Sequence, residues 1–157
     1  MTDKNPLVSV IMNCFNGEKY LLKATDSVLK QKYQNWELIF WDNKSTDSSE
    51  KIFKSIKDKR FKYFLADKHT SLYKARNLAI EKANGIYLSF LDTDDYWVDI
   101  KLESQLRVMK SDRNLDFCFT KYFVLGCTLV SSNLSISLHI TATALMLSLA
   151  WTMALID

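Results

Sequence analysis

The strongest constraint on how this chain can fold is a regular alternation between apolar runs of strand length and segments with helical spacing. The runs read LVSVIMNC, WELIFW, FKYFLA, IYLSFL and LDFCFTKYF, and they occupy residues 7–14, 36–41, 61–66, 86–91 and 115–123. The helical segments lie between them, over residues 18–31, after Asp47, from Leu72 onward and after Asp99. Strands that are apolar throughout need cover on both faces. This order therefore predicts an α/β fold with a mostly parallel sheet and helices on both faces.

Two of the helix boundaries carry specific signals. Asp47 is followed three residues later by Glu50, which predicts Asp47 as the N-cap of the second helix. Asn84-Gly85 follows the third helical segment and predicts its C-cap.

Ligands bind in open parallel sheets in the crevice beyond the carboxyl ends of the strands. Here that rule selects residues 13–17, 41–47, 67–71 and 92–97. Asn16-Gly17 predicts a turn at the first of these places. Asp42 directly follows the second run, so we expect it at the lip of the crevice. Its carboxylate could accept hydrogen bonds from a base or a ribose, or from the local turn, and the sequence leaves both interpretations open.

The acidic stretch DTDD directly follows the fourth run. If the extended backbone continues, Asp92 and Asp94 lie on one side of it and Asp95 on the other. Two carboxylates about 4 Å apart repel each other by roughly 4 kcal/mol at an effective dielectric constant of about 20. A divalent cation such as Mg²⁺ or Mn²⁺ would relieve that repulsion. An Asp-rich turn before the next helix is the competing interpretation.

Two cations, Lys74 and Arg76, lie early in the third helical segment, where positive charge opposes the helix dipole. Their position indicates an anion nearby, such as a diphosphate. A solvated helix face explains Lys74 well. It explains Arg76 less well, because Arg76 lies beside Ala75 on the edge of the apolar face.

Four segments, taken together and in order, resemble the nucleotide-binding half of family-2 glycosyltransferases with the GT-A fold. They are VSVIMNCFNGEKYL, DNKSTDSS, KARNLAIEKANG and IYLSFLDTDD, and the likeness extends over roughly residues 6–110. The chain departs from the family pattern at Trp41, where the family has the first Asp of DDGS, at Lys44, where the family has glycine, at Leu78-Ala79 and at Ile86. None of these departures removes a residue expected to bind a ligand.

The resemblance implies a Rossmann-like GT-A fold and a role for each matching position. Asn13, Phe15 and Asn16 would border the nucleotide, Asp42 would hold the uracil of a UDP-sugar, and Arg76 would face its diphosphate. Asp92 and Asp94 would form the DxD pair that binds Mg²⁺ or Mn²⁺, with Asp92 also near the ribose and Asp95 in support.

The resemblance also implies an activity. The sugar of a nucleotide-diphosphate donor would pass, with inversion, to a saccharide or lipid-linked acceptor in cell-envelope polysaccharide synthesis. The family's later half supplies the acceptor site and a carboxylate base. Because Asp157 and the C-terminus are the only carboxylates after Asp116, no catalytic base is assigned. The alternatives are a non-catalytic remnant that binds UDP only, and a different doubly wound protein, such as a phospho-receiver or small-molecule binder, with an acidic metal pocket.

Charge divides the chain into two parts. Every Lys, Arg and Glu and all but one Asp lie within residues 1–121, and Asp157 is the one exception. We therefore expect an incomplete GT-A nucleotide-sugar-binding domain over residues 1–121 and an uncharged apolar tail over residues 122–157. The tail allows three interpretations. It could be a membrane span over residues 135–156, close to the ~20 residues that a bilayer needs, a truncated or frame-shifted end, or a buried strand-and-helix continuation.

The remaining composition narrows the class of protein. A formal net charge of +3 is too small to indicate nucleic acid binding. Cys14, Cys118 and Cys127 lack paired spacing, which predicts a reduced protein without disulfides or a zinc site. The first apolar run is too short for a secretory signal. These features predict a cytoplasmic protein, with the inner face of the membrane as an alternative if residues 122–157 associate with lipid.

Overall fold

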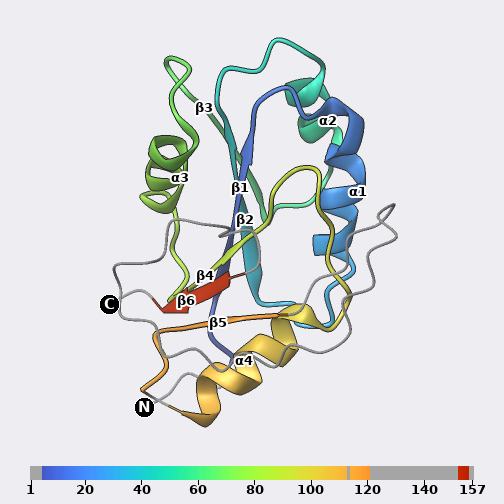
Figure 1. Cartoon of the computed structure of the whole chain (residues 1–157). Helices are drawn as coiled ribbons and strands as arrows, with labels where there is room; N and C mark the ends of the chain where they lie inside the picture. Colours follow the sequence, from blue (N-terminus) through green and yellow to red (C-terminus); the bar gives the residue numbers. More distant parts are fainter. Residues whose placement is uncertain (1–4, 113, 121–151, 156–157) are drawn as a thin grey trace, which may run out of the picture.

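The protein's structure, a computed structural model, describes residues 5–112, 114–120 and 152–155 (Figure 1). Its strands are β1 (Val8–Cys14), β2 (Trp36–Asp42), β3 (Phe61–Leu65), β4 (Tyr87–Phe90), β5 (Phe117–Phe119) and β6 (Thr152–Leu155). Its helices are α1 (Glu18–Leu29), α2 (Ser49–Ser55), α3 (Leu72–Ile80) and α4 (Lys101–Ser111). Each run predicted as a strand contains one, and each predicted helix is present.

One sheet lies at the centre of the described part, with the strand order β3-β2-β1-β4-β6-β5. β1 pairs in parallel with both β2 and β4, and β2 pairs in parallel with β3. β6 runs antiparallel to its neighbours β4 and β5. The prediction of a mostly parallel α/β sheet is therefore confirmed.

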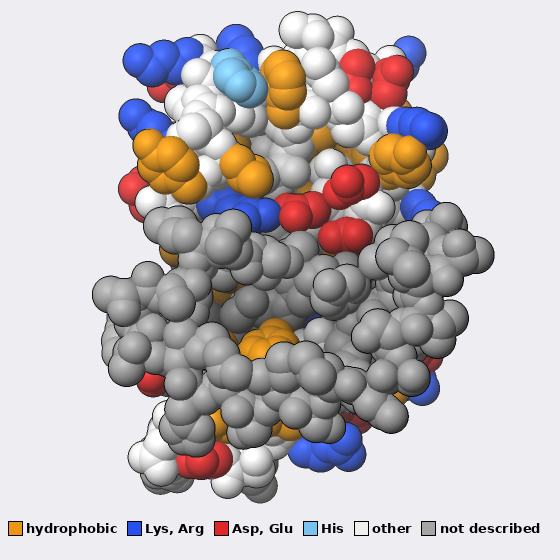
Figure 2. Space-filling view, in the orientation of Figure 1, with side chains coloured by type: hydrophobic (Ala, Val, Ile, Leu, Met, Phe, Trp, Pro, Cys, Tyr) orange, Lys and Arg blue, Asp and Glu red, His pale blue; other side chains and the backbone are white. Residues whose placement is uncertain are grey.

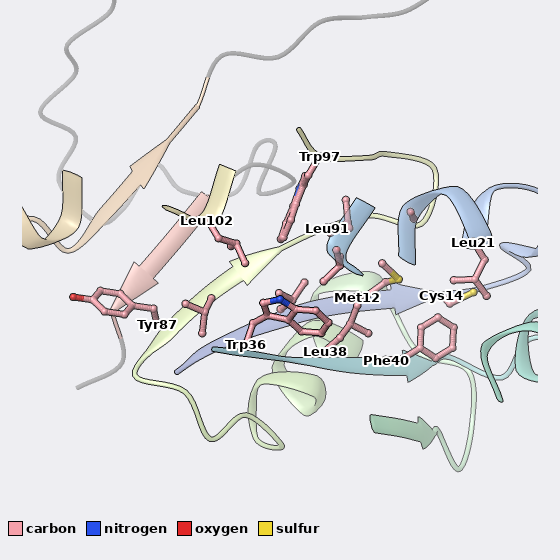
Figure 3. Packing of buried hydrophobic residues seen from close by; sticks show 14 of the residues in the cluster. Met12, Cys14, Leu21, Trp36, Leu38, Phe40, Tyr87, Leu91, Trp97 and Leu102 are labelled. Carbon is pink, nitrogen blue, oxygen red and sulfur yellow. The ribbon is translucent and has the colours of Figure 1, made fainter. Parts of the chain in front are cut away.

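Helices cover both faces of the sheet, and the alternation of side chains along β1 decides which core each residue joins. Val10 and Met12 pack in the larger hydrophobic cluster, together with residues of α1, α2 and α4 (Figure 3). Ile11 joins the smaller cluster, with Ala75 and Ala79 of α3. The side of the sheet that faces α3 therefore carries the odd-numbered residues of β1.

The predicted N-cap of α2 is wrong by one residue. The cap position is Ser48, which makes no side-chain cap hydrogen bond. Asp47, one residue earlier, instead accepts hydrogen bonds from the backbone N–H groups of Ser49 and Glu18, both at 2.9 Å. One carboxylate thus satisfies the first N–H groups of both α2 and α1 and ties the two helices together.

The predicted C-cap of α3 is also wrong. The helix ends at Ile80 with Glu81 as its cap, ahead of Asn84-Gly85. Gly85 is required for a different reason. A Cβ atom there would lie 2.7 Å from the carbonyl oxygen of Leu7 and 2.7 Å from the backbone nitrogen of Ser9. Glycine therefore lets the chain enter β4 directly against β1.

A buried carboxylate, Glu37, stabilises the amino end of the sheet. It is 4% exposed and accepts hydrogen bonds from Ser9 Oγ at 2.6 Å, Lys62 Nζ at 2.5 Å and the backbone N–H of Asn84 at 2.7 Å. Burial by itself would raise the pKa of the Glu37 carboxyl, but the hydrogen bonds from Lys62, Ser9 and Asn84 together lower it. Glu37 therefore links β1, β2, β3 and the approach to β4.

We predict that Glu37→Gln lowers the free energy of unfolding at pH 7 by about 1–3 kcal/mol, because the partners lose a buried anionic acceptor. The pKa of the Glu37 carboxyl is lower in the folded state than in the unfolded state, where it is near 4.3. The ionised carboxylate therefore stabilises the fold above the unfolded-state pKa, and this stabilisation is lost as the pH falls through the folded-state pKa. The difference between wild type and Glu37→Gln should therefore shrink on acidification. Urea denaturation at several pH values measures it.

The control for this prediction is Glu50→Gln. Glu50 pairs with Lys54 at 2.5 Å on the surface, where its side chain is 48% exposed, and we expect a change below about 0.5 kcal/mol. Equal stability of Glu37→Gln and wild type at pH 7 would contradict the role given to Glu37.

Most of the predicted tail lies outside the described residues. β6 is the exception, and its backbone pairs with both β4 and β5. The three interpretations of the tail, including the span over residues 135–156, stay predictions. None of the helices in the described ranges is long and apolar enough to cross a membrane.

Candidate functional site

The loops that follow β1 and β2 are joined by hydrogen bonds at the carboxyl edge of the sheet. Ser45 Oγ accepts a hydrogen bond from the backbone N–H of Asn16 at 3.0 Å, and Asn16 Oδ1 accepts one from the N–H of Thr46 at 2.8 Å. Gly17 donates its N–H to Ser49 Oγ at 3.0 Å. These bonds join the predicted site segments 13–17 and 41–47. We call the loops joined in this way the rim of the site.

Asn43, which directly follows β2, joins the loop after β3 to the same rim. Its side chain donates to the carbonyl oxygen of Thr70 at 2.7 Å and accepts from the backbone N–H of Thr70 at 3.1 Å. His69 Nδ1 lies 3.0 Å from the carbonyl oxygen of Asn43, and the His69 ring packs 4.3 Å from the ring of Phe15. Phe15 is nevertheless 51% exposed, so much of its surface remains open to a ligand.

The acidic loop after β4 completes the arrangement. A Cβ atom on Gly17 would lie 3.1 Å from Thr93 Oγ1 and 2.9 Å from Cys14 Sγ. Glycine at this turn therefore permits the close approach of residues 92–95. All four segments predicted from the strand order meet at this edge.

The acidic residues do not continue the extended strand, which was one of the two interpretations of this stretch. The backbone N–H of Asp95 donates to the carbonyl oxygen of Asp92 at 3.1 Å, which closes a turn through Thr93 and Asp94. The turn interpretation is therefore correct for the backbone. Asp94 is exposed, and Asp95 is partly buried. Burial raises the pKa of the Asp95 carboxyl, and the nearby charges of Asp94 and Asp92 raise it further.

Arg76 of α3 reaches the acidic loop. Its guanidinium lies 2.6 Å from Asp92 Oδ1, and the two side chains are 14% and 32% exposed. Acidic side chains next to a basic one are visible on the face drawn in Figure 2. The position of Arg76 beside the apolar face of α3 therefore aims it at the crevice.

Asp42 differs from its expected position at the lip. It is only 1% exposed, and its two oxygens accept hydrogen bonds from the backbone N–H of Ser45 at 2.7 Å and from the Tyr63 hydroxyl at 2.8 Å. Burial raises the pKa of the Tyr63 hydroxyl, and its bond to Asp42 raises it further. Asp42 therefore helps to build the rim, and a ligand would have to share its carboxylate with these two donors.

Asn13, unlike Asp42, is buried without a hydrogen-bond partner for its side chain among the described residues. It is 8% exposed, and neither its side-chain nitrogen nor its side-chain oxygen has a hydrogen-bond partner among the described residues. It follows Ile11 by two positions, so it lies on the α3 side of the sheet, level with Trp41 of β2. Buried polar groups are almost always paired, so an unpaired amide beside the crevice indicates a place for a ligand or water.

A metal site is not complete in the protein alone. Among residues 5–112, 114–120 and 152–155, no three His, Cys, Asp or Glu side chains gather closely enough to hold a metal ion. The oxygen ligands that Asp92 and Asp94 offer suit a hard cation such as Mg²⁺ or Mn²⁺. A cation bound to them would need further ligands from the substrate or from water.

Comparison with known proteins identifies the group to which this arrangement belongs. The model of the family "Glycosyl transferase family 2" matches residues 9–152. The chain belongs to this family. An uncharacterized glycosyltransferase of Haemophilus influenzae is 47% identical over 106 residues, which are 66% of this chain and 42% of that protein. Escherichia coli WfgD, named as a UDP-Glc:α-D-GlcNAc-diphosphoundecaprenol β-1,3-glucosyltransferase, is 36% identical over 120 residues, which are 76% of this chain and 47% of WfgD.

A solved structure agrees with this family assignment. S. aureus TarS in complex with UDP-GlcNAc superposes with a TM-score of 0.72 and 27% identity, over 80% of this chain and 37% of TarS. The predicted GT-A fold is therefore confirmed. This family 2 chain spans less than half the length of the proteins named here.

Some residues of the rim were missed by sequence reasoning. Asn43, His69 and Thr93 fall within the predicted loops, but nothing in their local sequence showed that Asn43 would contact His69 or that Thr93 would lie against Gly17. Tyr63 lies in the middle of an apolar run, so its bond to Asp42 had no sequence signal. The rule of strand ends could have nominated Asn43 and His69, because both lie in segments that it selects.

The backbone at Lys44, where the resemblance noted above leads us to expect glycine, has a φ of 72°. This conformation is unfavourable for a residue with a Cβ atom. Lys44→Gly should remove this strain, but glycine also has more conformational freedom to lose when the chain folds. We predict a net rise in the free energy of unfolding of about 0.5–1 kcal/mol. Urea denaturation measures the change.

Lys57→Gly is the matched control, because Lys57 is an exposed loop lysine without positive φ. It should lower the free energy of unfolding by about 0.5–1 kcal/mol. Similar losses in both variants would show that the backbone at Lys44 is not strained.

Proposed function

We propose that this chain binds a UDP-sugar as a complex with Mg²⁺ or Mn²⁺ and belongs to an enzyme that transfers the sugar to a saccharide or lipid-linked acceptor in cell-envelope polysaccharide synthesis. The carrying observation is the Arg76–Asp92 pair, 2.6 Å apart, beside Asp94 at the carboxyl edge of a family 2 fold. A cation and carboxylates placed together there suit a metal-bound diphosphate. The donor and lipid-linked acceptor named for WfgD support the substrate classes.

The nucleoside half of the donor would bind between the loops that follow β1, β2 and β3. Phe15 offers an exposed aromatic surface for a base, and Asn13 offers an unpaired amide donor and acceptor. Asn16 fixes the loop around them, and Asp42 is available for further hydrogen bonds because a carboxylate oxygen accepts more than one. The binding of UDP-GlcNAc by TarS supports uridine as the base.

The diphosphate would bind at the acidic loop. Asp92 and Asp94 would hold the cation, with the donor's phosphate oxygens completing its coordination, since Mg²⁺ is commonly bound by one or two carboxylates plus phosphates. When bound, the cation would supply positive charge to the departing UDP. Arg76, now paired with Asp92, would turn its remaining N–H donors toward the same phosphates.

Transfer itself needs groups beyond this site. Inversion would require a carboxylate that takes the proton from the acceptor hydroxyl, and we assign that role to no described residue. A chain that binds UDP without transferring sugar is the second candidate. It is considered because no described residue is assigned as the base. A transfer assay with a radiolabelled UDP-sugar and a lipid-linked acceptor separates the two.

We predict that UDP binds to the full chain in the presence of Mn²⁺ and that EDTA weakens binding roughly tenfold or more. Asp94→Asn should cause a similar loss in Mn²⁺, because it removes one negative ligand, and little further loss in EDTA. Isothermal titration calorimetry measures these affinities.

Asp26→Asn is the control, since Asp26 lies on the surface of α1 in an exposed pair with Lys30. It should bind UDP as the wild type does. A folded wild type that fails to bind UDP would contradict the donor site, whereas full binding by Asp94→Asn would contradict the metal assignment alone.

A further inference from the structure

The segment that leads away from the acidic loop is irregular, yet buried groups hold it in place. Residues 96–100 connect the loop to α4 without regular secondary structure. Tyr96, Val98 and Ile100 are exposed, whereas Trp97 is 4% exposed and packs in the larger hydrophobic cluster. Figure 3 shows Trp97 near Leu91, the residue that precedes the acidic loop.

Lys101 is the first buried group that holds this segment. It is 3% exposed, and its Nζ donates to Ser89 Oγ in β4 at 3.1 Å and to Gln105 Oε1 in α4 at 2.6 Å. The same Nζ lies 4.0 Å from the centre of the Trp97 ring. Burial lowers the pKa of the Lys101 amine to about 7, and the Cys118 thiol of β5 acts in the opposite direction. One side chain therefore joins residues on both sides of the acidic loop.

Gln31 is the second buried group. It is fully buried at the end of α1, and its Nε2 donates to the carbonyl oxygen of Val98 at 2.7 Å. Its Oε1 accepts the backbone N–H of Leu102 at 3.0 Å. The N-cap residue of α4, Ile100, has no side chain that could accept a hydrogen bond. Gln31, which follows the C-cap of α1, therefore supplies the missing cap of α4.

We propose that Lys101 and Gln31 are positioning residues that preset the acidic loop for the metal-bound diphosphate. This inference rests on the proposed function, because it assigns a purpose to the fixed geometry of Asp92 and Asp94. Lys101 holds the strand before the loop and Trp97 after it, and Gln31 holds the following residues against α1. A loop fixed at both ends loses less conformational freedom on binding than a mobile one.

The test combines hydrogen exchange with UDP binding in the full chain. Lys101→Met keeps the length of the side chain but removes its hydrogen bonds. Exchange of the Asp95 and Leu102 amides should become about tenfold faster or more, while the Leu38 amide in β2 should stay within about twofold. The gain in UDP affinity that Mn²⁺ provides should fall about fivefold or more, whereas affinity in EDTA should change less than about twofold.

Two further variants keep the test decisive. Ser89→Ala removes only one acceptor of Lys101 and should show the same pattern to a smaller degree, so it serves if Lys101→Met does not fold. Arg107→Met, an exposed position on the same helix, should leave exchange and binding unchanged. Unchanged exchange at Asp95 in folded Lys101→Met or Ser89→Ala would overturn the proposal. Equal loss of affinity in Mn²⁺ and EDTA would reduce Lys101 to a general structural role.

The exchange experiment also separates this proposal from the proposed function. If the wild type binds no UDP but the Asp95 amide still exchanges faster in the variants, the donor site is wrong and the restraint on the loop is real. The role in metal-bound diphosphate recognition would then be rejected.

Discussion

The site depends on the parallel pairing of β1 with β2 on one side and β4 on the other. Parallel strands end at the same edge, so the loops after them must meet, and a ligand there contacts segments far apart in sequence. β1 is buried along its whole length, which fixes the side of the sheet that each residue faces. A shift of one residue would turn Asn13 from the α3 side into the larger core and would dismantle the site.

Polar bonds between the loops convert this shared edge into a defined shape. Asn16, Asn43 and Asp47 each bond to backbone groups of another loop or helix, so the rim does not rely on apolar packing alone. Asp42, from a buried position, accepts hydrogen bonds from the backbone N–H of Ser45 in its own loop and from the Tyr63 hydroxyl of β3. By contrast, Asn13 has no partner among the described residues. Most polar groups of the rim are therefore paired, whereas the Asn13 amide and the Trp41 indole N–H have no partner among the described residues.

The sequence predicted the order of strands and helices and the four segments that meet at the site, because apolar periodicity and the rule of strand ends are local patterns with a global consequence. It left the turn at Asp94 as one of two interpretations, and it did not predict the burial of Asp42. Both depend on hydrogen bonds to residues distant in sequence or on loop geometry, which periodicity does not encode. The role of Gly85 was misassigned for a similar reason. A side chain at this position would collide with the neighbouring strand β1 and the residue before it, and the local sequence does not show that contact.

The central claim is that the carboxyl-edge crevice binds a nucleotide diphosphate, and the unpaired amide of Asn13 provides the most direct test. The side-chain NH₂ signal of Asn13 in an isotope-labelled chain would be followed by NMR as UDP and Mg²⁺ are added. The account predicts that this signal shifts, while the side-chain amide of Asn35, which bonds to the carbonyl oxygen of Asn5 at 2.6 Å before β2, stays in place. A chain that saturates with UDP while the Asn13 signal does not move would contradict the account.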